Sequence, residues 1–248
     1  MIVDCNVSLG HWPFQYAGIE TARQLEAHLK REGIGRALVS SADAVLFPEP
    51  EECNARLRKA LAGCPSLTAI PVLNPRTGSA PEILATAELV AVKLIPNYHG
   101  YSLTDPRAIA VCRVARQRRV AVMVQMRMEA ERGHSEFLKM PGVSVDDITA
   151  LAAAVPDLSL VALCPYLAEA VTLAKLPGVF VDISFTENPD TLAKLCAQVP
   201  AERVLFGSHT PWYYTGAAMA KLTSSEIGER ERTAIGSGNA VRLLGLTV

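Results

Sequence analysis

Short runs rich in Val, Ile and Leu recur along the chain, and between them lie longer stretches whose apolar residues follow helical spacing. Near-continuous apolar runs of this length are typical of parallel strands that are buried on both faces. The predicted strands are residues 2–7, 36–40, 67–73, 90–95, 119–125, 158–163, 179–183 and 203–206. The predicted helices are residues 20–32, 49–62, 80–88, 106–118, 145–155, 166–175, 189–198 and 226–235.

The repeated strand-then-helix order predicts an α/β fold, a single (β/α)8 TIM barrel. Several predicted helices begin next to a capping residue, for instance Asp105 and Ser144. The competing fold is an open doubly wound sheet, which more typically has fewer strands and a glycine-rich first turn. The glycine pairs at 33–35 and 236–238 lack a G-x-G-x-x-G continuation after a strand, so dinucleotide binding is excluded.

The size and charge of the chain narrow the class of protein further. With 248 residues, 50% of them hydrophobic, the chain is long enough to bury a sizeable core. No low-complexity stretch or Pro/Gly/Ser-rich linker divides it, so we expect one domain over residues 1–248. The formal net charge of −1 gives no reason to expect nucleic acid or an anionic membrane as a partner. No apolar run approaches the length needed to span a bilayer.

Six cysteines are scattered along the chain without a C-x-x-C pair. This spacing is not that of a zinc knuckle or a disulfide framework, and reduced thiols fit it best. The first residues lead directly into a predicted strand, without the basic and apolar regions of a secretory signal. We therefore expect a cytoplasmic protein.

The carboxyl ends of the strands are where reactive residues are expected, because active sites of TIM barrels lie at that end. The segments there are residues 6–12, 40–43, 74–76, 93–101, 125–129, 164–166, 182–187 and 208–212. Side chains alternate along a strand, so Asp4, Asn6 and Ser8 share the face expected to point to the barrel axis. The apolar residues expected to face the helices are Val3, Cys5 and Val7.

Four segments of the chain carry the pattern of a known barrel family. They are MIVDCNVSLG at the start, AVKLIPNYHGYSL in the middle, and RVLFGSHTPW and GNAVRLLGL near the end. They resemble the amidohydrolase-2 family of metal-dependent hydrolases and decarboxylases, and the resemblance covers nearly the whole chain. It implies the same barrel with its active site at the mouth.

In that family the first strand carries His-x-His and the last an Asp in a Gly-Ser-Asp-x-Pro turn. Those positions here are Asn6, Ser8 and His209.

The resemblance also indicates where metal ligands are expected, and the residues found there differ from the family pattern. Gln125 and Cys164 stand where the fifth and sixth strands of the family commonly carry histidines. Asn, Ser and Gln are poor replacements for imidazole around zinc, and one thiolate among them does not complete a tetrahedral site. We therefore expect no cofactor and no family-typical divalent metal such as zinc, and we interpret Cys164 as a buried structural cysteine. An unusual metal site built from His11, His99 and His209 is the least favoured alternative.

His209 and Lys93 are the predicted catalytic residues. Histidine acts as a general base near neutral pH, and His209 lies at the tip of the last strand. A lone buried ammonium is unfavourable, so Lys93 needs a carboxylate such as Asp4 or Asp182, or an anionic ligand. Arg127 offers a bidentate fork to a ligand carboxylate; the alternative is a structural salt bridge with Glu129 or Glu187.

The residues expected to line the substrate site are Asn6, Ser8, His11, Trp12, His99, Gln125, Arg127, Asp182 and Trp212. His28 and His134 are interpreted as a helix-surface residue and a loop residue. The expected partner is a small molecule, with a carboxylate as one candidate, and a homo-oligomer is left open.

Two functions stay open from the sequence. The first is a hydrolase-class activity on a small carbonyl or carboxylate compound without the usual metal site of the family. The second is a catalytically inactive barrel that binds a metabolite or a protein partner through the same mouth. Polar and titratable replacements at the site favour the first, and the loss of the standard ligands favours the second.

Overall fold

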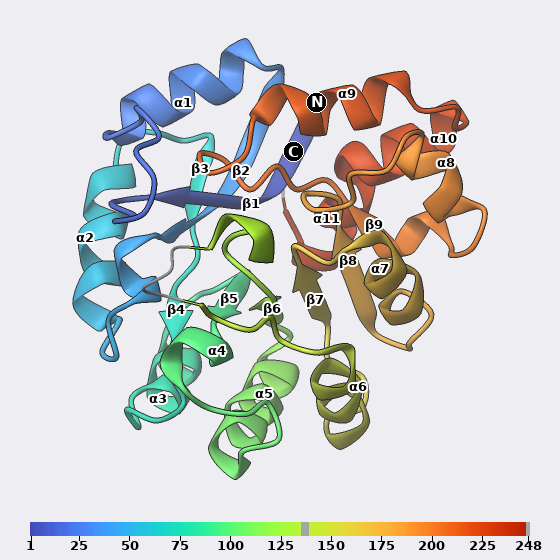
Figure 1. The fold of residues 1–248 in the computed structure, drawn as a ribbon. Coiled ribbons are helices and arrows are strands. Elements are labelled where there is room, and N and C mark those ends of the chain that lie inside the picture. The colour runs from blue at the N-terminus through green and yellow to red at the C-terminus, as the bar shows by residue number, and fades with distance from the viewer. Residues whose placement is uncertain (135–138, 247–248) are drawn as a thin grey trace.

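Parallel strands form a closed barrel, and helices surround it on the outside (Figure 1). The computed structural model describes residues 1–134 and 139–246. The strands are β1 (Ile2–Leu9), β2 (Ile34–Ser41), β3 (Leu67–Ala69), β4 (Val72–Leu73), β5 (Ala91–Leu94), β6 (Ala121–Gln125), β7 (Leu160–Leu163), β8 (Val179–Asp182) and β9 (Val204–Leu205). Every strand pair is parallel, in the order β1-β2-β3 and β4-β5-β6-β7-β8-β9.

Backbone hydrogen bonds close the two seams between these sheets. At the first seam the Ile70 amide donates to the Val39 carbonyl over 2.9 Å, and β3 and β4 together occupy the predicted strand 67–73. Pro71 has no amide hydrogen and therefore interrupts the ladder between them. At the second seam the Cys5 amide donates to the Phe206 carbonyl over 3.0 Å, which joins the last strand to β1. The predicted (β/α)8 barrel is confirmed.

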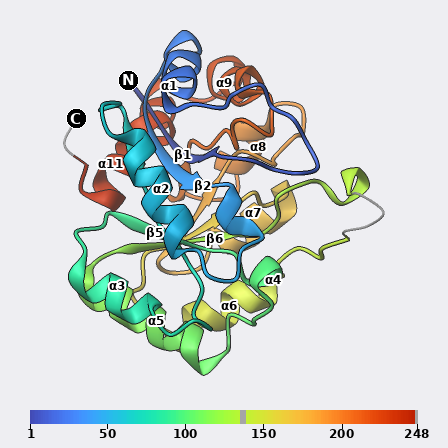
Figure 2. The same ribbon diagram turned by 90° about the vertical axis from the view of Figure 1, so that its left-hand side faces the viewer.

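The helices ring the barrel, as two views at right angles show (Figures 1 and 2). They are α1 (Ala22–Arg31), α2 (Glu51–Leu61), α3 (Ala80–Thr86), α4 (Pro96–His99), α5 (Pro106–Arg118), α6 (Val145–Ala154), α7 (Leu167–Leu173), α8 (Thr191–Cys196), α9 (Thr215–Ser224), α10 (Glu229–Thr233) and α11 (Asn239–Leu244). The predicted caps Asp105 and Ser144 each accept a backbone hydrogen bond at the start of α5 and α6. No helix in these described ranges is long and apolar enough to cross a membrane.

Helix α9 is missing from the sequence prediction, and its composition explains why. Its buried residues are Thr215, Ala218 and Leu222. Only Leu222 is large and apolar, so the buried stripe leaves a weak helical signal in the sequence.

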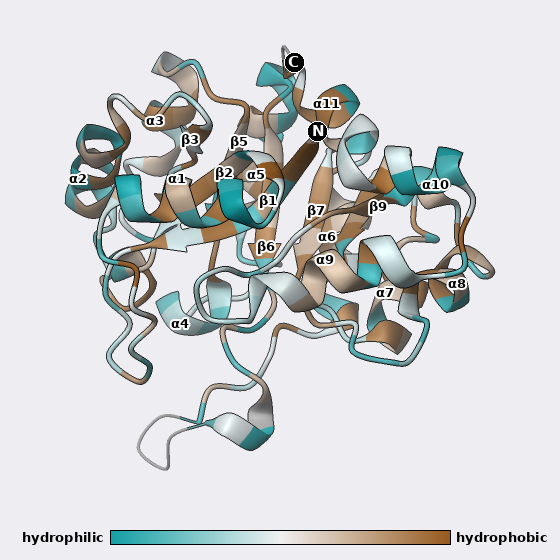
Figure 3. Cartoon of the chain, turned by 90° about the horizontal axis from the view of Figure 1, so that it is seen from above, coloured by the Kyte–Doolittle hydropathy of each residue, from teal (hydrophilic) through white to brown (hydrophobic). Residues whose placement is uncertain are grey.

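Two apolar layers hold the barrel together, with hydrophobic strands at the centre of the fold (Figure 3). The outer layer lies between strands and helices. The inner layer fills the amino-terminal half of the barrel, and α11 packs against it through Ala240 and Leu244. Helix α11 contacts both β1 and β9, so it closes the bottom of the barrel.

The alternation predicted for the first strand is wrong in its first half. Val3 and Cys5 pack in the inner layer with Leu38, Met123 and Leu205, not against the helices. The register of β1 against β2 shifts between Asp4 and Val7, which is a β-bulge. A bulge inserts one extra residue and so reverses the sidedness of the residues beyond it. Val7 lies past the bulge and does face the helices, as predicted.

Candidate functional site

Polar side chains from opposite strands meet on the barrel axis directly above the inner apolar layer. Asn6 of β1 donates through Nδ2 to Asp182 Oδ2 at the end of β8 over 2.9 Å. Lys93 of β5 donates through Nζ to Asn6 Oδ1 over 3.1 Å. Gln125 of β6 donates through Nε2 to the sulfur of Cys164, just after β7, over 2.9 Å. The structure thus brings together four residues predicted for the site and Cys164, and all five are buried. We call these five residues the central cluster.

Lys93 carries the positive charge of the central cluster in an environment that disfavours it. Burial lowers the pKa of Lys93 to about 8, although Cys164, Asp182 and Asp4 act in the opposite direction. The predicted carboxylate partners therefore lie near Lys93, while its hydrogen-bond acceptor is the Asn6 amide. An ammonium that is held mainly by an amide oxygen is only partly compensated.

The two buried carboxyls of the site are also perturbed. Burial raises the pKa of Asp4 to about 7, against hydrogen bonds from Ser208 and the Asn6 amide. Burial likewise raises the pKa of Asp182. Gly207 permits the close approach of the last strand to Asp182, because a Cβ there would lie 2.5 Å from Oδ2. No side chain other than hydrogen fits at that distance.

Cys164 is a hydrogen-bonded thiol within the cluster. Asn6, Gln125 and Ser184 all point a polar atom at its sulfur, at 3.3, 2.9 and 3.3 Å. Burial raises the pKa of Cys164 to about 12, so it stays protonated at neutral pH. A neutral thiol is a weak metal ligand and nucleophile, because the thiolate is the reactive species.

His209 lies at the tip of the last strand, fully buried, with a defined tautomer. Its Nε2 lies 2.8 Å from the Met128 carbonyl oxygen, which only accepts, so Nε2 carries the hydrogen. Within the described residues Nδ1 has no hydrogen-bond partner. Burial, followed by the charge of Lys93, lowers the pKa of His209 to about 3, so the ring is neutral with a free lone pair on Nδ1.

Both Cys164 and His209 have a left-handed backbone conformation, with φ of 59° and 57°. Such a conformation costs about 1–3 kcal/mol for a residue other than glycine, and it concentrates at functional sites. The surrounding contacts at the site therefore hold the backbone of Cys164 and His209 in this conformation at the expense of stability.

A third apolar cluster contains two residues predicted for the site. Trp12 and Trp212 pack in it with Met128, Val72 and Ile95. The Trp12 indole donates to Glu129 Oε1 over 2.6 Å, and its ring lies 6.4 Å from that of Trp212. The polar residues of the central cluster are themselves buried from solvent.

Arg127 forms an ion pair within the protein, and the prediction that its partner is Glu129 or Glu187 is wrong. Its Nη1 and Nη2 atoms each donate over 2.7 Å to the carboxylate of Glu169 on α7. Nη1 also donates to the Cys164 carbonyl over 2.6 Å, and the guanidinium lies 4.1 Å from the Tyr166 ring centre. The fork is therefore not free for a ligand carboxylate in this structure.

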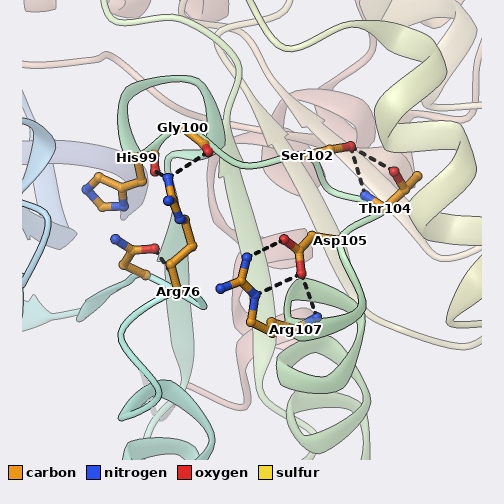
Figure 4. Close-up of polar contacts among 8 residues, drawn as sticks. Arg76, His99, Gly100, Ser102, Thr104, Asp105 and Arg107 are labelled. Atoms are coloured by element: carbon orange, nitrogen blue, oxygen red, sulfur yellow. Dashed lines mark hydrogen bonds and ion pairs between the residues drawn. The ribbon is translucent and has the colours of Figure 1, made fainter.

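The remaining predicted histidines lie apart from the central cluster. His99 donates through Nε2 to the Ala44 carbonyl over 2.9 Å, and Arg76 holds its loop through the His99 and Gly100 carbonyls (Figure 4). His11 is exposed, and its amide donates to Asp43. Within residues 1–134 and 139–246 no three His, Cys, Asp or Glu side chains form a group that could hold a metal ion. The alternative site of His11, His99 and His209 is therefore not assembled.

The donors at the expected metal positions do not suit a divalent cation. Ser8 lies 3.5 Å from Ser40, Asn6 directs its amide nitrogen at Asp182, and Cys164 is a neutral thiol. The Lys93 ammonium, itself a cation, binds the remaining amide oxygen. Among the expected positions His209 offers one suitable ligand, its Nδ1, which is unpartnered among the described residues, and a single imidazole does not complete a zinc or manganese site.

A hollow of about 590 Å³ opens next to His209 at the mouth of the barrel. Its aromatic wall is formed by Tyr166, Phe185 and Tyr213, and Arg132 and Glu187 lie among its polar residues. The Phe185 and Tyr213 ring centres lie 5.7 and 5.8 Å from the His209 ring. Sequence reasoning did not single out these aromatic residues, although the strand-tip segments contain Tyr166 and Phe185.

Comparisons with known proteins agree with this architecture. A family model described as Amidohydrolase matches residues 20–246. Among curated proteins none matches the chain.

Several solved structures share the fold. A 2,6-dihydroxybenzoate decarboxylase in complex with 2,6-dihydroxybenzoate has a TM-score of 0.75 at 15% identity, covering 98% of each chain. A 5-carboxyvanillate decarboxylase from Novosphingobium aromaticivorans, complexed with manganese and 4-hydroxy-3-methoxy-5-nitrobenzoic acid, has a TM-score of 0.78 at 11% identity. It covers 99% of this chain and 96% of that one. A dihydroxybenzoic acid decarboxylase from Polaromonas sp. JS666, with bound manganese and 2-nitroresorcinol, has a TM-score of 0.74 at 15% identity and covers 99% and 97%.

Proposed function

The chain belongs to the amidohydrolase family, and from this premise we propose that it is a metal-independent member that acts on a small carbonyl or carboxylate compound. The observation that carries the proposal is His209, a neutral imidazole whose Nδ1 lone pair has no partner among the described residues. It lies at the end of a TIM barrel where active sites are built. His209 is the proposed general base, accepting a proton through Nδ1.

In this proposal Lys93 supplies the positive charge of the site. Manganese is bound in two of the structurally similar decarboxylases, and the Lys93 ammonium takes over the role of a cation here. Its charge stabilises negative charge that develops on the reacting compound, and Asn6 orients it. The partial compensation of Lys93 supports this role, because a fully paired cation has less charge to offer an anion.

The proposed ligand is a small aromatic carboxylate in the hollow beside His209. Tyr166, Phe185 and Tyr213 offer ring faces against which a planar group stacks. Arg132, which is 85% exposed and only loosely paired with Glu187 at 3.7 Å, is available to a carboxylate at the same hollow. The compounds bound in the similar decarboxylases are also substituted benzene rings.

Catalysis in this form requires the aromatic wall to move. A pKa of about 3 makes His209 a weak base while it is sealed, and burial is the main cause. Displacement of Phe185 and Tyr213 exposes the ring to solvent and returns its pKa toward the ordinary histidine range.

One observation favours a second candidate, a catalytically inactive barrel that binds a ligand at its mouth. The central cluster is sealed and its polar atoms largely satisfy one another. A binder needs only the outer hollow, whereas an enzyme needs access to His209.

Ligand binding and turnover separate the two candidates. A panel of small aromatic carboxylates, with matching esters and amides, is screened by thermal shift, since a ligand of the native state raises the midpoint. Turnover of each compound is then followed by mass spectrometry, with His209→Gln as the test variant and exposed His11→Gln as the matched control. We expect turnover to fall by about a hundredfold or more in His209→Gln alone. Binding without turnover identifies the inactive barrel, and an absence of binding contradicts both.

Elemental analysis tests the metal-independent part of the proposal. The expected result after mild dialysis is far less than one equivalent of zinc, manganese or iron per chain. About one equivalent, retained by the wild type and lost when Asp182 is replaced, would contradict it.

A further inference from the structure

An unbroken line of hydrogen-bonding side chains joins the buried Asp4 carboxyl to the outside of the barrel. Asp4 Oδ2 accepts from Ser208 Oγ over 2.5 Å, and Ser208 Oγ lies 2.6 Å from Thr210 Oγ1. Thr210 Oγ1 lies 2.7 Å from Thr215 Oγ1, which lies 2.7 Å from His28 Nε2 on helix α1. The three hydroxyl residues between the two ends are themselves buried.

The chemistry of these groups gives the line a direction. An ionised Asp4 only accepts, so the Ser208 hydroxyl donates to it and must accept from Thr210. Thr210 then accepts from Thr215, and Thr215 accepts from a protonated Nε2 of His28. Each hydroxyl donates one hydrogen bond along the line and accepts one. When Asp4 carries a proton, the same line runs in reverse and His28 Nε2 becomes the acceptor.

The charges around Asp4 give it a reason to gain and lose a proton. Asp182 on β8 and Lys93 on β5 both act on it electrostatically, and Cys5 is its titratable neighbour on β1. Two ionised carboxyls against one ammonium leave a net negative charge in a sealed interior. One added proton neutralises that charge, and burial favours the protonated carboxyl over the carboxylate.

The outer end of the line reaches a hollow of about 300 Å³ between the β1 loop and the start of α9. His28 and Thr215 line it together with Tyr16, Tyr213 and Tyr214, its other titratable residues. Helices α1 and α9 flank β1 on this side of the barrel (Figure 1). His28, predicted as a helix-surface residue, is thus half-buried and in contact with Thr215.

We propose that Ser208, Thr210 and Thr215 form a proton path through which Asp4 exchanges its proton with solvent at His28 while the barrel stays closed. His28 takes up a proton from solvent at Nδ1 and releases the proton on Nε2, and one proton arrives at Asp4 Oδ2. Each hydroxyl passes its own hydrogen inward and receives one from outside, so its composition is unchanged. The path does not depend on the reaction proposed above, because it concerns only the ionisation of Asp4.

Deuterium exchange of the Asp4 carboxyl tests the path. The infrared C=O band of protonated Asp4 is assigned by its loss in Asp4→Asn, at a pH just below the Asp4 pKa of about 7. Its shift is then timed after transfer into heavy water. Thr210→Val removes the central hydroxyl at nearly constant volume. We expect it to slow exchange about tenfold, because a barrier raised by roughly the energy of one hydrogen bond lowers a rate by that factor. Thr210→Ser keeps a hydroxyl and restores the wild-type rate.

Controls distinguish the path from a general loosening of the barrel. Thr186→Val removes another fully buried hydroxyl, one that donates to the Ile183 carbonyl, and leaves the rate unchanged. His28→Leu blocks the outer end at a half-buried helix position, so it slows exchange even if Thr210→Val does not fold. Unchanged exchange in His28→Leu means that Asp4 receives its proton by barrel opening, and equal slowing in Thr186→Val means that the effect is not specific to this line. Either result overturns the proposal.

Discussion

Two buried cations at the carboxyl end of the barrel, Arg127 and Lys93, have opposite surroundings. Arg127 has a bidentate carboxylate, a backbone carbonyl and an aromatic face. Lys93 has one amide oxygen as its hydrogen-bond acceptor, with the carboxyls of Asp4 and Asp182 acting from further away. On sequence grounds both were candidates to bind an anion.

The difference shows which cation is structural. Arg127 joins the end of β6 to α7 and has its charge neutralised locally, so its removal mainly affects folding. Lys93 lies on the barrel axis with the Asn6 amide oxygen as its hydrogen-bond acceptor, and in the proposed function its ammonium stabilises negative charge that develops on the reacting compound.

The largest expected effect is the loss of the Arg127 carboxylate. Glu169→Ala leaves a buried guanidinium without its counter-charge and removes the bond from the Tyr166 amide at the start of α7. We expect the free energy of unfolding to fall by about 3 kcal/mol, measured by urea denaturation. The control is Glu52→Ala, which breaks the exposed pair with Arg56 and changes stability by less than about 0.5 kcal/mol. Equal losses in the two variants would show that Arg127 is not held as a structural cation.

The second prediction concerns Lys93 and the dependence of stability on pH. The pKa of Lys93 falls from 10.5 to about 8 on folding, so between these pH values the unfolded chain binds more protons. The free energy of unfolding then rises with pH through this window, by on the order of 3 kcal/mol in full. Lys93→Met removes this contribution, and the comparison of the two proteins cancels the titration of other groups. Parallel pH profiles for wild type and Lys93→Met contradict the lowered pKa.

The smallest effect tests the aromatic contact of Arg127. Tyr166→Leu removes the ring whose centre lies 4.1 Å from the guanidinium, at an expected loss of about 1 kcal/mol. Tyr166→Phe keeps the ring face and is expected to stay within about 0.5 kcal/mol of the wild type. A loss in Tyr166→Phe as large as in Tyr166→Leu assigns the contribution to the hydroxyl, and the cation–π contact then contributes nothing.

Most of the barrel can be predicted from the spacing of apolar residues. The predicted strands overlap the observed ones, and the broken strand 67–73 lies in one predicted segment. Two of the failures have local causes: α9 buries small residues that carry little periodic signal, and a β-bulge between Asp4 and Val7 puts Cys5 on the opposite side of β1 from Val7. A bulge depends on pairing with β2, which the pattern of one strand does not contain.

The candidate site divides in the same way. The strand-tip rule places Asn6, Lys93, Gln125 and Asp182 together from the sequence, and the structure brings them into contact. The strand-tip rule does not identify the hydrogen-bond and ion-pair partners of a side chain. Glu169 lies 42 residues from Arg127, and His28 lies 187 residues from Thr215.

The sequence by itself determined the order of strands and helices and the end of the barrel that carries polar residues. These depend on periodicity and residue type, which are local properties. Only the tertiary structure decided which charge is compensated. Whether Arg127 or Lys93 keeps its charge available depends on side chains that meet across the barrel, and electrostatic energies depend on those distances and on burial.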